Sequence, residues 1–373
     1  MTGILHPPQQ PPRQPPGGTA PSGSPSDTVP DAAPRQRDAY FDNVKFFLIL
    51  LVVVGHFWEV FKKDSYAVDA AYSVVYGFHM PLFVFVSGYF SRGFMRSTEK
   101  FRGVFPTLVV PFAIFNALYA ALGYLKGDSV PLHTFFRPQF LMWFLVALVL
   151  WRLSAPLWPH LRYPVVVAVA LSLVAGSWSF SSDTTLCRAA GLLPFFVLGL
   201  TIRPERVHAL RSRGWTRWAG AFVLLAALPV AYVWQRGTVV PPIEHGVRLW
   251  NRGYEYMDFT MPEGMAYRLL AMAFAVLLGA AFLAVVPRGD AWYTRLGTRT
   301  MYVYLLHGLA VKALYNLGAF EGRFIGSPPG LVLLTVGALA FGLLLATTPV
   351  VRLTRRMVEP KGHGILKQKQ RAA

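Results

Sequence analysis

From residue 41 to residue 350, long apolar stretches alternate with short polar segments along the chain. These stretches are long enough to cross a bilayer as helices, because about 20 apolar residues span its hydrocarbon core. The pattern therefore predicts an all-α integral membrane protein. We expect about ten transmembrane helices, at residues 41–61, 70–90, 104–125, 139–155, 163–179, 186–202, 217–235, 266–286, 299–318 and 329–350.

The lysines and arginines follow the same alternation. About two thirds of the 36 basic residues lie in the two tails or in every second connecting segment. The segments between these are poorer in basic residues, and the longest, 236–265, holds four acidic residues against three arginines. Because cytoplasmic loops carry an excess of lysine and arginine, we predict that both termini are cytoplasmic.

The composition supports a membrane protein. Hydrophobic residues make up 54% of the chain and charged residues only 14%, and the mean hydropathy is +0.41. A soluble domain usually has about 25% charged residues. The formal net charge of +18 does not indicate a nucleic-acid partner, because the basic residues are spread over the connecting segments without a DNA- or RNA-binding motif.

The two ends of the chain differ from its middle. Residues 1–38 contain ten prolines and almost no apolar side chains, which predicts a disordered, proline-rich cytoplasmic tail. Residues 39–352 form the predicted transmembrane domain, and residues 353–373 form a basic cytoplasmic tail. The single cysteine, Cys187, excludes an internal disulfide framework.

Two ionisable residues lie inside the first predicted helix, where lipid disfavours charge. Ten residues separate Lys45 from His56, so the two side chains return to nearly the same side of the helix, about 16 Å apart along its axis. Asp42 and Glu59 fall near the same stripe. Asp42 is expected either to pair with Lys45 or to help order the entry, and Glu59 is interpreted as an ordinary interface residue. A polar stripe on such a helix must face protein, water or substrate, which makes it the first candidate for a functional site.

Short polar or turn-rich motifs occur in order along the predicted helices. They are Asp42-Asn43-Val44-Lys45 with Gly55-His56, Phe78-His79-Met80-Pro81-Leu82-Phe83, Ser87-Gly88-Tyr89, Trp143-Phe144-Leu145, Leu193-Pro194-Phe195-Phe196-Val197-Leu198-Gly199, and Gly297 with Tyr302-Val303-Tyr304-Leu305-Leu306-His307. The ordered set resembles the acyltransferase 3 family of integral membrane acyltransferases, from about residue 38 to residue 350. The motif around His79 is similar to the branch that includes fucose 4-O-acetylase-like proteins.

The resemblance implies an enzyme of the inner or plasma membrane that moves an acyl group onto a hydroxyl of a sugar, glycan, lipid or secondary metabolite. The acyl group is commonly acetyl from cytosolic acetyl-CoA, so acyl-CoA is the expected co-substrate and membrane lipid the other partner. The family's signature of a basic residue, ten residues and a histidine corresponds here to Lys45 and His56. Many members carry Arg-x-x-Arg after the second helix, a spacing that this chain lacks. The predicted donor contacts are therefore Lys45, Arg92, Arg96, Lys100 and Arg102.

Acyl transfer to a hydroxyl needs a base that removes the alcohol proton, and histidine suits this task because it titrates near neutrality. The predicted catalytic residues are His56 as general base, Lys45 toward the donor, and His79 and His307 sharing the proton or contacting the acceptor. Each histidine could equally be a packed, hydrogen-bonded residue with no chemical role. Lys45 could equally be a side chain that extends to the lipid headgroups. No metal is expected, because histidines on separate helices offer no metal-binding spacing.

Two other functions stay open at the level of sequence. A transporter or exporter would use Lys45, His56 and His79 as a proton relay, whereas a scaffold without chemistry would use them only for packing. The segment 236–265 carries Trp250 among acidic residues, which suits either a carbohydrate contact or the membrane interface. Direct transfer and a covalent acyl-histidine are likewise alternatives.

Overall fold

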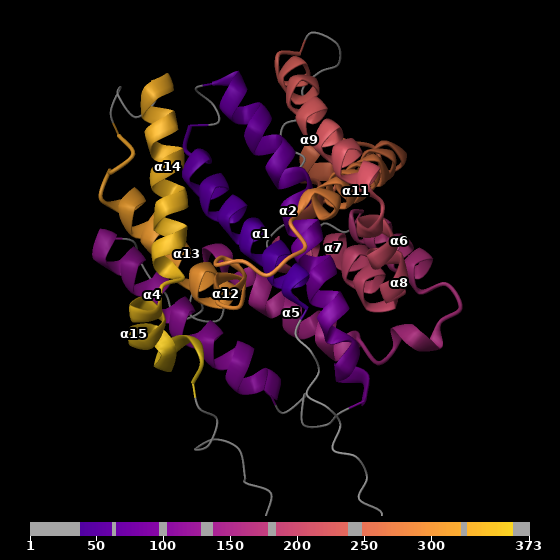
Figure 1. Cartoon of the computed structure of the whole chain (residues 1–373), viewed down its shortest axis with the longest axis horizontal. Coiled ribbons are helices and arrows are strands. Elements are labelled where there is room, and N and C mark those ends of the chain that lie inside the picture. Colours follow the sequence, from indigo (N-terminus) through magenta and orange to yellow (C-terminus); the bar gives the residue numbers. More distant parts are fainter. Residues whose placement is uncertain are drawn as a thin grey trace, which may run out of the picture. The chain divides into compact units, whose positions relative to one another are not determined.

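Each of the ten apolar stretches contains a long helix in the computed structural model (Figure 1). It describes residues 38–61, 65–96, 103–127, 137–177, 184–237, 248–321 and 327–360, and no strand occurs among them. The ten helices are α1 (Ala39–Trp58), α2 (Tyr66–Ser91), α4 (Val110–Lys126), α5 (Trp143–Ser154), α6 (Pro164–Ala175), α7 (Thr184–Thr201), α9 (Gly214–Gln235), α11 (Met261–Val285), α13 (Thr300–Asn316) and α14 (Pro328–Leu345). Shorter helices are α8 (Pro204–Ser212), α10 (Arg248–Asn251), α12 (Thr294–Gly297) and α15 (Thr348–Val358).

Length and hydropathy separate these helices into two groups. Within the described residues, six segments are long and apolar enough to cross a membrane: Ala39–Trp58, Tyr66–Phe94, Phe105–Lys126, Gly214–Gln235, Met261–Val285 and Pro328–Leu345. Helices α5, α6 and α7 are also apolar, but they are shorter than these six segments. The predicted all-α membrane class is confirmed, while ten crossings and cytoplasmic termini stay predictions.

The predicted tails lie mostly outside the described residues. Asp38 is the only residue of the N-terminal tail that the structure describes, and its carboxylate accepts a hydrogen bond from the backbone N–H of Tyr40 and caps α1. At the other end, α15 continues past residue 352 to Val358. The predicted boundaries of the transmembrane domain therefore stay predictions.

Contacts between helix ends show how the helices alternate in direction. The Tyr40 hydroxyl, at the start of α1, donates to the Leu283 carbonyl near the end of α11 at 2.6 Å. Arg92, just after α2, donates to carbonyls at the end of α7. Arg299, just before α13, donates to the Ala346 carbonyl that follows α14 at 2.7 Å. We call this end of the helix bundle the basic end, because the arginine-rich segments adjoin it, and the opposite end the far end.

Helices α2 and α7 cross in close contact near the basic end. A Cβ atom added at Gly88 of α2 would overlap the Phe196 carbonyl oxygen, and one added at Gly199 of α7 would overlap the Phe85 carbonyl oxygen. Each glycine thus lets the backbone of the other helix approach, as small residues do between membrane helices. Gly88 of the Ser87-Gly88-Tyr89 motif is thus a close-packing residue.

Candidate active site

A cavity of about 870 Å³ follows the polar stripe of α1. The helix contributes Lys45, Ile49, Val52, His56 and Glu59, which alternate in steps of four and three residues and therefore share one side of the helix. At 1.5 Å per residue, this stripe is about 21 Å long. The prediction that Lys45 and His56 face one common space is confirmed.

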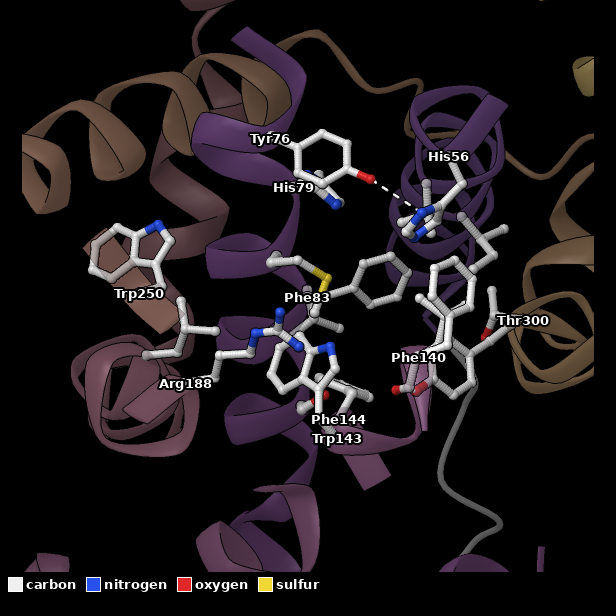
Figure 2. A pocket seen from close by; sticks show the side chains of 18 of the residues that line it. His56, Tyr76, His79, Phe83, Phe140, Trp143, Phe144, Arg188, Trp250 and Thr300 are labelled. Carbon is white, nitrogen blue, oxygen red and sulfur yellow. Dashed lines mark hydrogen bonds between the residues drawn. The ribbon is translucent and has the colours of Figure 1, made fainter. Parts of the chain in front are cut away.

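Five other parts of the chain complete the cavity wall (Figure 2). Helix α2 provides the largest share, with tyrosines toward the far end and Phe90 at the basic end. The remaining wall comes from the segment that begins α5, from α7, from the region of α10 and from the start of α13. Their side chains include Phe140, Trp143, Arg188, Trp250, Arg252, Thr300 and Tyr304. Trp143 belongs to the Trp143-Phe144-Leu145 motif, so that motif contributes directly to the cavity wall.

The Nδ1 atom of His56 has two oxygen neighbours. The Glu59 carboxylate lies 3.3 Å from Nδ1, and the Tyr76 hydroxyl lies 3.2 Å from it (Figure 2). A carboxylate only accepts hydrogen bonds, so the contact favours the tautomer with the proton on Nδ1. That tautomer leaves the Nε2 lone pair of His56 available as a base. Neither partner was a candidate from sequence, although the three-residue spacing of His56 and Glu59 on one helix allowed the contact.

The structure brings all three predicted histidines together, with different exposure to the cavity. His79 lines the cavity, and its Nδ1 donates to the Val75 carbonyl one turn earlier at 2.8 Å. His307 is fully buried, and its Nδ1 donates to the Val303 carbonyl at 2.7 Å. The His307 ring centroid lies 5.5 Å from that of His56. His307 thus packs behind the base, whereas His79 faces the same space as the base.

Phe140 holds an unusual backbone conformation beside the base. Its φ angle is 46°, in the left-handed region, where a non-glycine residue costs about 1–3 kcal/mol. Its ring centroid lies 5.3 Å from that of His56. Asn116 of α4 fixes the preceding segment, because its side chain accepts from the Gln139 N–H at 2.8 Å and donates to the Arg137 carbonyl at 3.2 Å. No sequence signal marked this phenylalanine.

Lys45 lies at the basic end of the cavity. Its ammonium group is 2.6 Å from an Asp42 carboxylate oxygen, which confirms the predicted pair. The same ammonium group lies 5.5 Å from the centroid of the Phe90 ring. An aromatic face and a cation therefore stand together where the cavity meets the basic end.

Arg92, a predicted donor contact, is engaged elsewhere. Its guanidinium donates to the carbonyls of Gly199 and Leu200, both at 3.1 Å, and to that of Ile202. It also lies over the Tyr89 ring, 4.2 Å from the centroid. These bonds satisfy carbonyls at the end of α7 that have no partner within their own helix. The other predicted donor contacts in this region, the side chains of Arg96, Lys100 and Arg102, lie outside the described residues.

The cavity carries more positive than negative charge. Among the described residues that line it, Lys45, Arg152, Arg188 and Arg252 are basic, whereas Glu59 is acidic. The three arginines were not candidates from sequence, because single arginines near helix ends are typical of membrane interfaces. A cavity with this charge suits anionic ligands. Within the described residues, no group of three or more His, Cys, Asp or Glu side chains has the arrangement of a metal site.

Known proteins resemble this chain over most of its length. A family model described as an acyltransferase domain matches residues 38–347. The nodulation protein NolL of Sinorhizobium fredii is 26% identical over 354 residues, which cover 86% of this chain and 90% of that protein. The nodulation protein NolL of Mesorhizobium japonicum is 36% identical over 76 residues, or 20% of each chain. No solved structure matches. The family match spans every helix that contributes to the cavity.

Proposed function

The chain belongs to the acyltransferase 3 family, and on that premise we propose that it is a membrane O-acyltransferase that moves an acetyl group from acetyl-CoA to a hydroxyl. The observation that carries this proposal is the position of His56. Its Nδ1 has a carboxylate neighbour and a hydroxyl neighbour, and its ring lines a cavity with cations at both ends. This is the arrangement that a general base needs: an oriented ring with one free nitrogen.

The proposed reaction is acyl transfer with His56 as base. The Nε2 atom of His56 accepts the proton of the acceptor hydroxyl while the alcohol oxygen attacks the thioester carbonyl carbon. The carbon–sulfur bond then breaks, and the proton passes from His56 to the departing sulfur of coenzyme A. Glu59 keeps the ring in the required tautomer and stabilises its positive charge during the step. His79, which lines the same cavity from α2, is the proposed neighbour of the reacting hydroxyl.

The two substrates approach from opposite ends in this proposal. Acetyl-CoA arrives at the basic end, where Lys45 and Arg152 meet its phosphates and Phe90 offers an aromatic face. The acceptor occupies the part of the cavity toward the far end, between His56 and Trp250. The chain acts in the inner or plasma membrane, and the acceptor is a sugar, glycan, lipid or secondary metabolite.

The test follows labelled acetyl groups. Purified full-length protein in nanodiscs is given radiolabelled acetyl-CoA with a panel of methyl glycosides, and both acetylated product and free coenzyme A are measured. His56→Ala should lower the transfer rate about 10²- to 10⁴-fold. His160→Ala, at an exposed histidine outside the cavity, is the matched control and should leave the rate unchanged. Wild-type rates from a folded His56→Ala protein would overturn the proposal.

One observation favours a second candidate function. The cavity runs along α1 from Lys45 to Glu59, with His56 and His79 on its walls, as a proton-coupled exporter would require. Proteoliposomes separate the two functions. Solute flux that follows a pH gradient without acyl-CoA supports export, whereas acetyl transfer without gradient-driven flux supports the enzyme.

A further inference from the structure

Two arginines line the part of the cavity toward the far end. Arg188 extends from α7 toward the middle of the cavity, across from His56 and beside Trp143 (Figure 2). Its guanidinium carbon lies 4.9 Å from the centroid of the Trp143 ring. Arg252, which follows α10, lines the same cavity. Arg188 and Arg252 therefore belong to one cavity wall region, and both carry positive charge.

The guanidinium of Arg188 makes no hydrogen bond or ion pair with any residue in the described part of the chain, and its contact with Trp143 is a cation–π contact. Glu59, the acidic residue among the described lining residues, has its carboxylate 3.3 Å from Nδ1 of His56. A guanidinium has five N–H donors, and leaving them unpaired away from bulk water is costly. Arg188 therefore has donors to offer a ligand.

A neighbouring arginine shows the opposite use of the same side chain. Arg268 of α11 is buried, donates to the carbonyls of Ser172 and Arg252, and lies over the Tyr254 ring. Its bond to the Arg252 carbonyl, 3.2 Å long, fixes the backbone that carries the second cavity arginine. The site is thus built: one buried arginine holds the frame, and Arg188 and Arg252 line the cavity. The guanidinium of Arg252 also lies over the Tyr256 ring, 4.3 Å from its centroid.

We propose that Arg188 and Arg252 bind an anionic group, a carboxylate or a phosphate, on the acceptor that His56 deprotonates. This inference rests on the proposed acyl transfer and specifies the class of its acceptor. Guanidinium groups match the geometry of carboxylate and phosphate oxygens and form paired hydrogen bonds with them. Trp143 and Trp250, which line the same region, offer flat faces on which a ring next to the anion packs.

The donor does not account for these two cations. The phosphates of acetyl-CoA are assigned to Lys45 and Arg152, which lie toward the basic end, with Arg152 in the last turn of α5 and over the Phe94 ring. Arg188 lies in the first turns of α7, whose last turn adjoins the basic end through Arg92. The cavity therefore has two separate cationic regions, with His56 between Lys45 and the far end. The region of Lys45 and Arg152 serves the donor, and the region of Arg188 and Arg252 serves the acceptor.

Binding to sugars that differ only in charge tests the proposal. Full-length protein in nanodiscs is titrated calorimetrically with methyl glucoside, methyl glucuronide and methyl glucoside 6-phosphate. We expect the charged sugars to bind about 10- to 100-fold more tightly than the neutral one. The ratio between the two charged sugars tells a carboxylate-bearing acceptor from a phosphorylated one. Arg188→Gln should abolish the preference for charge, and Arg188→Lys should retain part of it.

Controls separate this inference from the proposed function. Arg236→Gln alters an exposed arginine after α9, outside the cavity, and should keep the full preference. The melting temperature of each variant reports folding, and release of coenzyme A from acetyl-CoA reports the chemistry independently of binding. Equal or absent binding of charged and neutral sugars, or a preference that survives in folded Arg188→Gln, overturns the inference. A different result would count against the proposed function: the wild type and all variants transfer no acetyl group, although the wild type still binds charged sugars more tightly than the neutral one.

Discussion

The two faces of α2 use their polar groups in opposite ways. On the cavity face, the Tyr76 hydroxyl contacts His56, and the His79 ring bonds to its own helix through Nδ1. On the α7 face, Gly88 brings two backbones together and Arg92 donates to carbonyls of the neighbouring helix. One face keeps hydrogen-bonding groups available for a ligand, and the other saturates them. The difference teaches that the position of a polar residue on this helix decides whether it lines the cavity or bonds to the neighbouring backbone.

The largest expected effect belongs to the cavity face and its base. Glu59→Gln removes the charge that orients and stabilises the His56 ring, and should lower the acetyl-transfer rate by about 10²-fold, the lower edge of what a general base contributes. The measurement is the steady-state rate in nanodiscs beside the melting temperature. Glu255→Gln, at an exposed carboxylate toward the far end, is the control. A wild-type rate in Glu59→Gln would show that Glu59 is only a neighbour of the base.

The next effect belongs to the α7 face. Gly199→Ala places a Cβ against the Phe85 carbonyl oxygen and should destabilise the protein by about 1–3 kcal/mol. Gly337→Ala in α14 is the matched control, because a Cβ added there meets no atom within 4 Å. Without a clash, alanine should stabilise a helix by about 0.5–1 kcal/mol relative to glycine. Thermal unfolding in detergent measures both, and equal melting temperatures would contradict the close crossing.

Arg92 and Lys45 sharpen the comparison, because both were predicted to contact the donor. Arg92→Gln breaks bonds to the end of α7 and should lower the free energy of unfolding by about 1–2 kcal/mol, with little change in the KM for acetyl-CoA. Lys45→Gln should instead raise the KM for acetyl-CoA, with little change in the free energy of unfolding. Arg217→Gln, at an exposed arginine of α9, controls for the loss of charge near the basic end. A raised KM for acetyl-CoA in Arg92→Gln would support the original prediction that Arg92 contacts the acyl donor.

The smallest effect is expected at Tyr76. Tyr76→Phe removes one neutral hydrogen bond to the His56 ring, worth about 0.5–1.5 kcal/mol, so the transfer rate should fall by a factor of about 2–10. Tyr66→Phe, at the exposed start of α2, is the control and should have the wild-type rate. A loss as large as that of His56→Ala would make Tyr76 itself a catalytic group.

Local patterns were enough to predict the helices and one wall of the cavity. The positions of Lys45 and His56 on one stripe follow from helical periodicity alone, and the pair of Asp42 and Lys45 follows from a three-residue spacing. The family motifs also marked His307, whose ring lies next to that of His56, and His79, whose ring packs against Tyr76, the hydroxyl neighbour of the base. Their roles in catalysis stay predictions.

Other parts of the site had no local signal. Arg188 is a single arginine near the start of an apolar helix, a position that lipid interfaces explain equally well. Phe140 is an ordinary apolar residue whose strained backbone depends on Asn116 of another helix. Glu59 was interpreted as an interface residue from the sequence. Its contact with His56 points to a role in a site only once the structure shows that both residues line a cavity.

The sequence by itself determined the membrane class, the helical segments and the shared stripe of Lys45 and His56, because transfer of apolar residues into lipid and the 3.6-residue turn act within one segment. Only the tertiary structure decided which polar residues are saturated and which are available. Arg92, Arg188 and Arg268 are the same residue type near the ends of apolar helices, yet two of them bond to carbonyls and one faces the cavity. That outcome depends on which helices pack together, and hydrogen-bond partners from distant segments are not encoded in any local pattern.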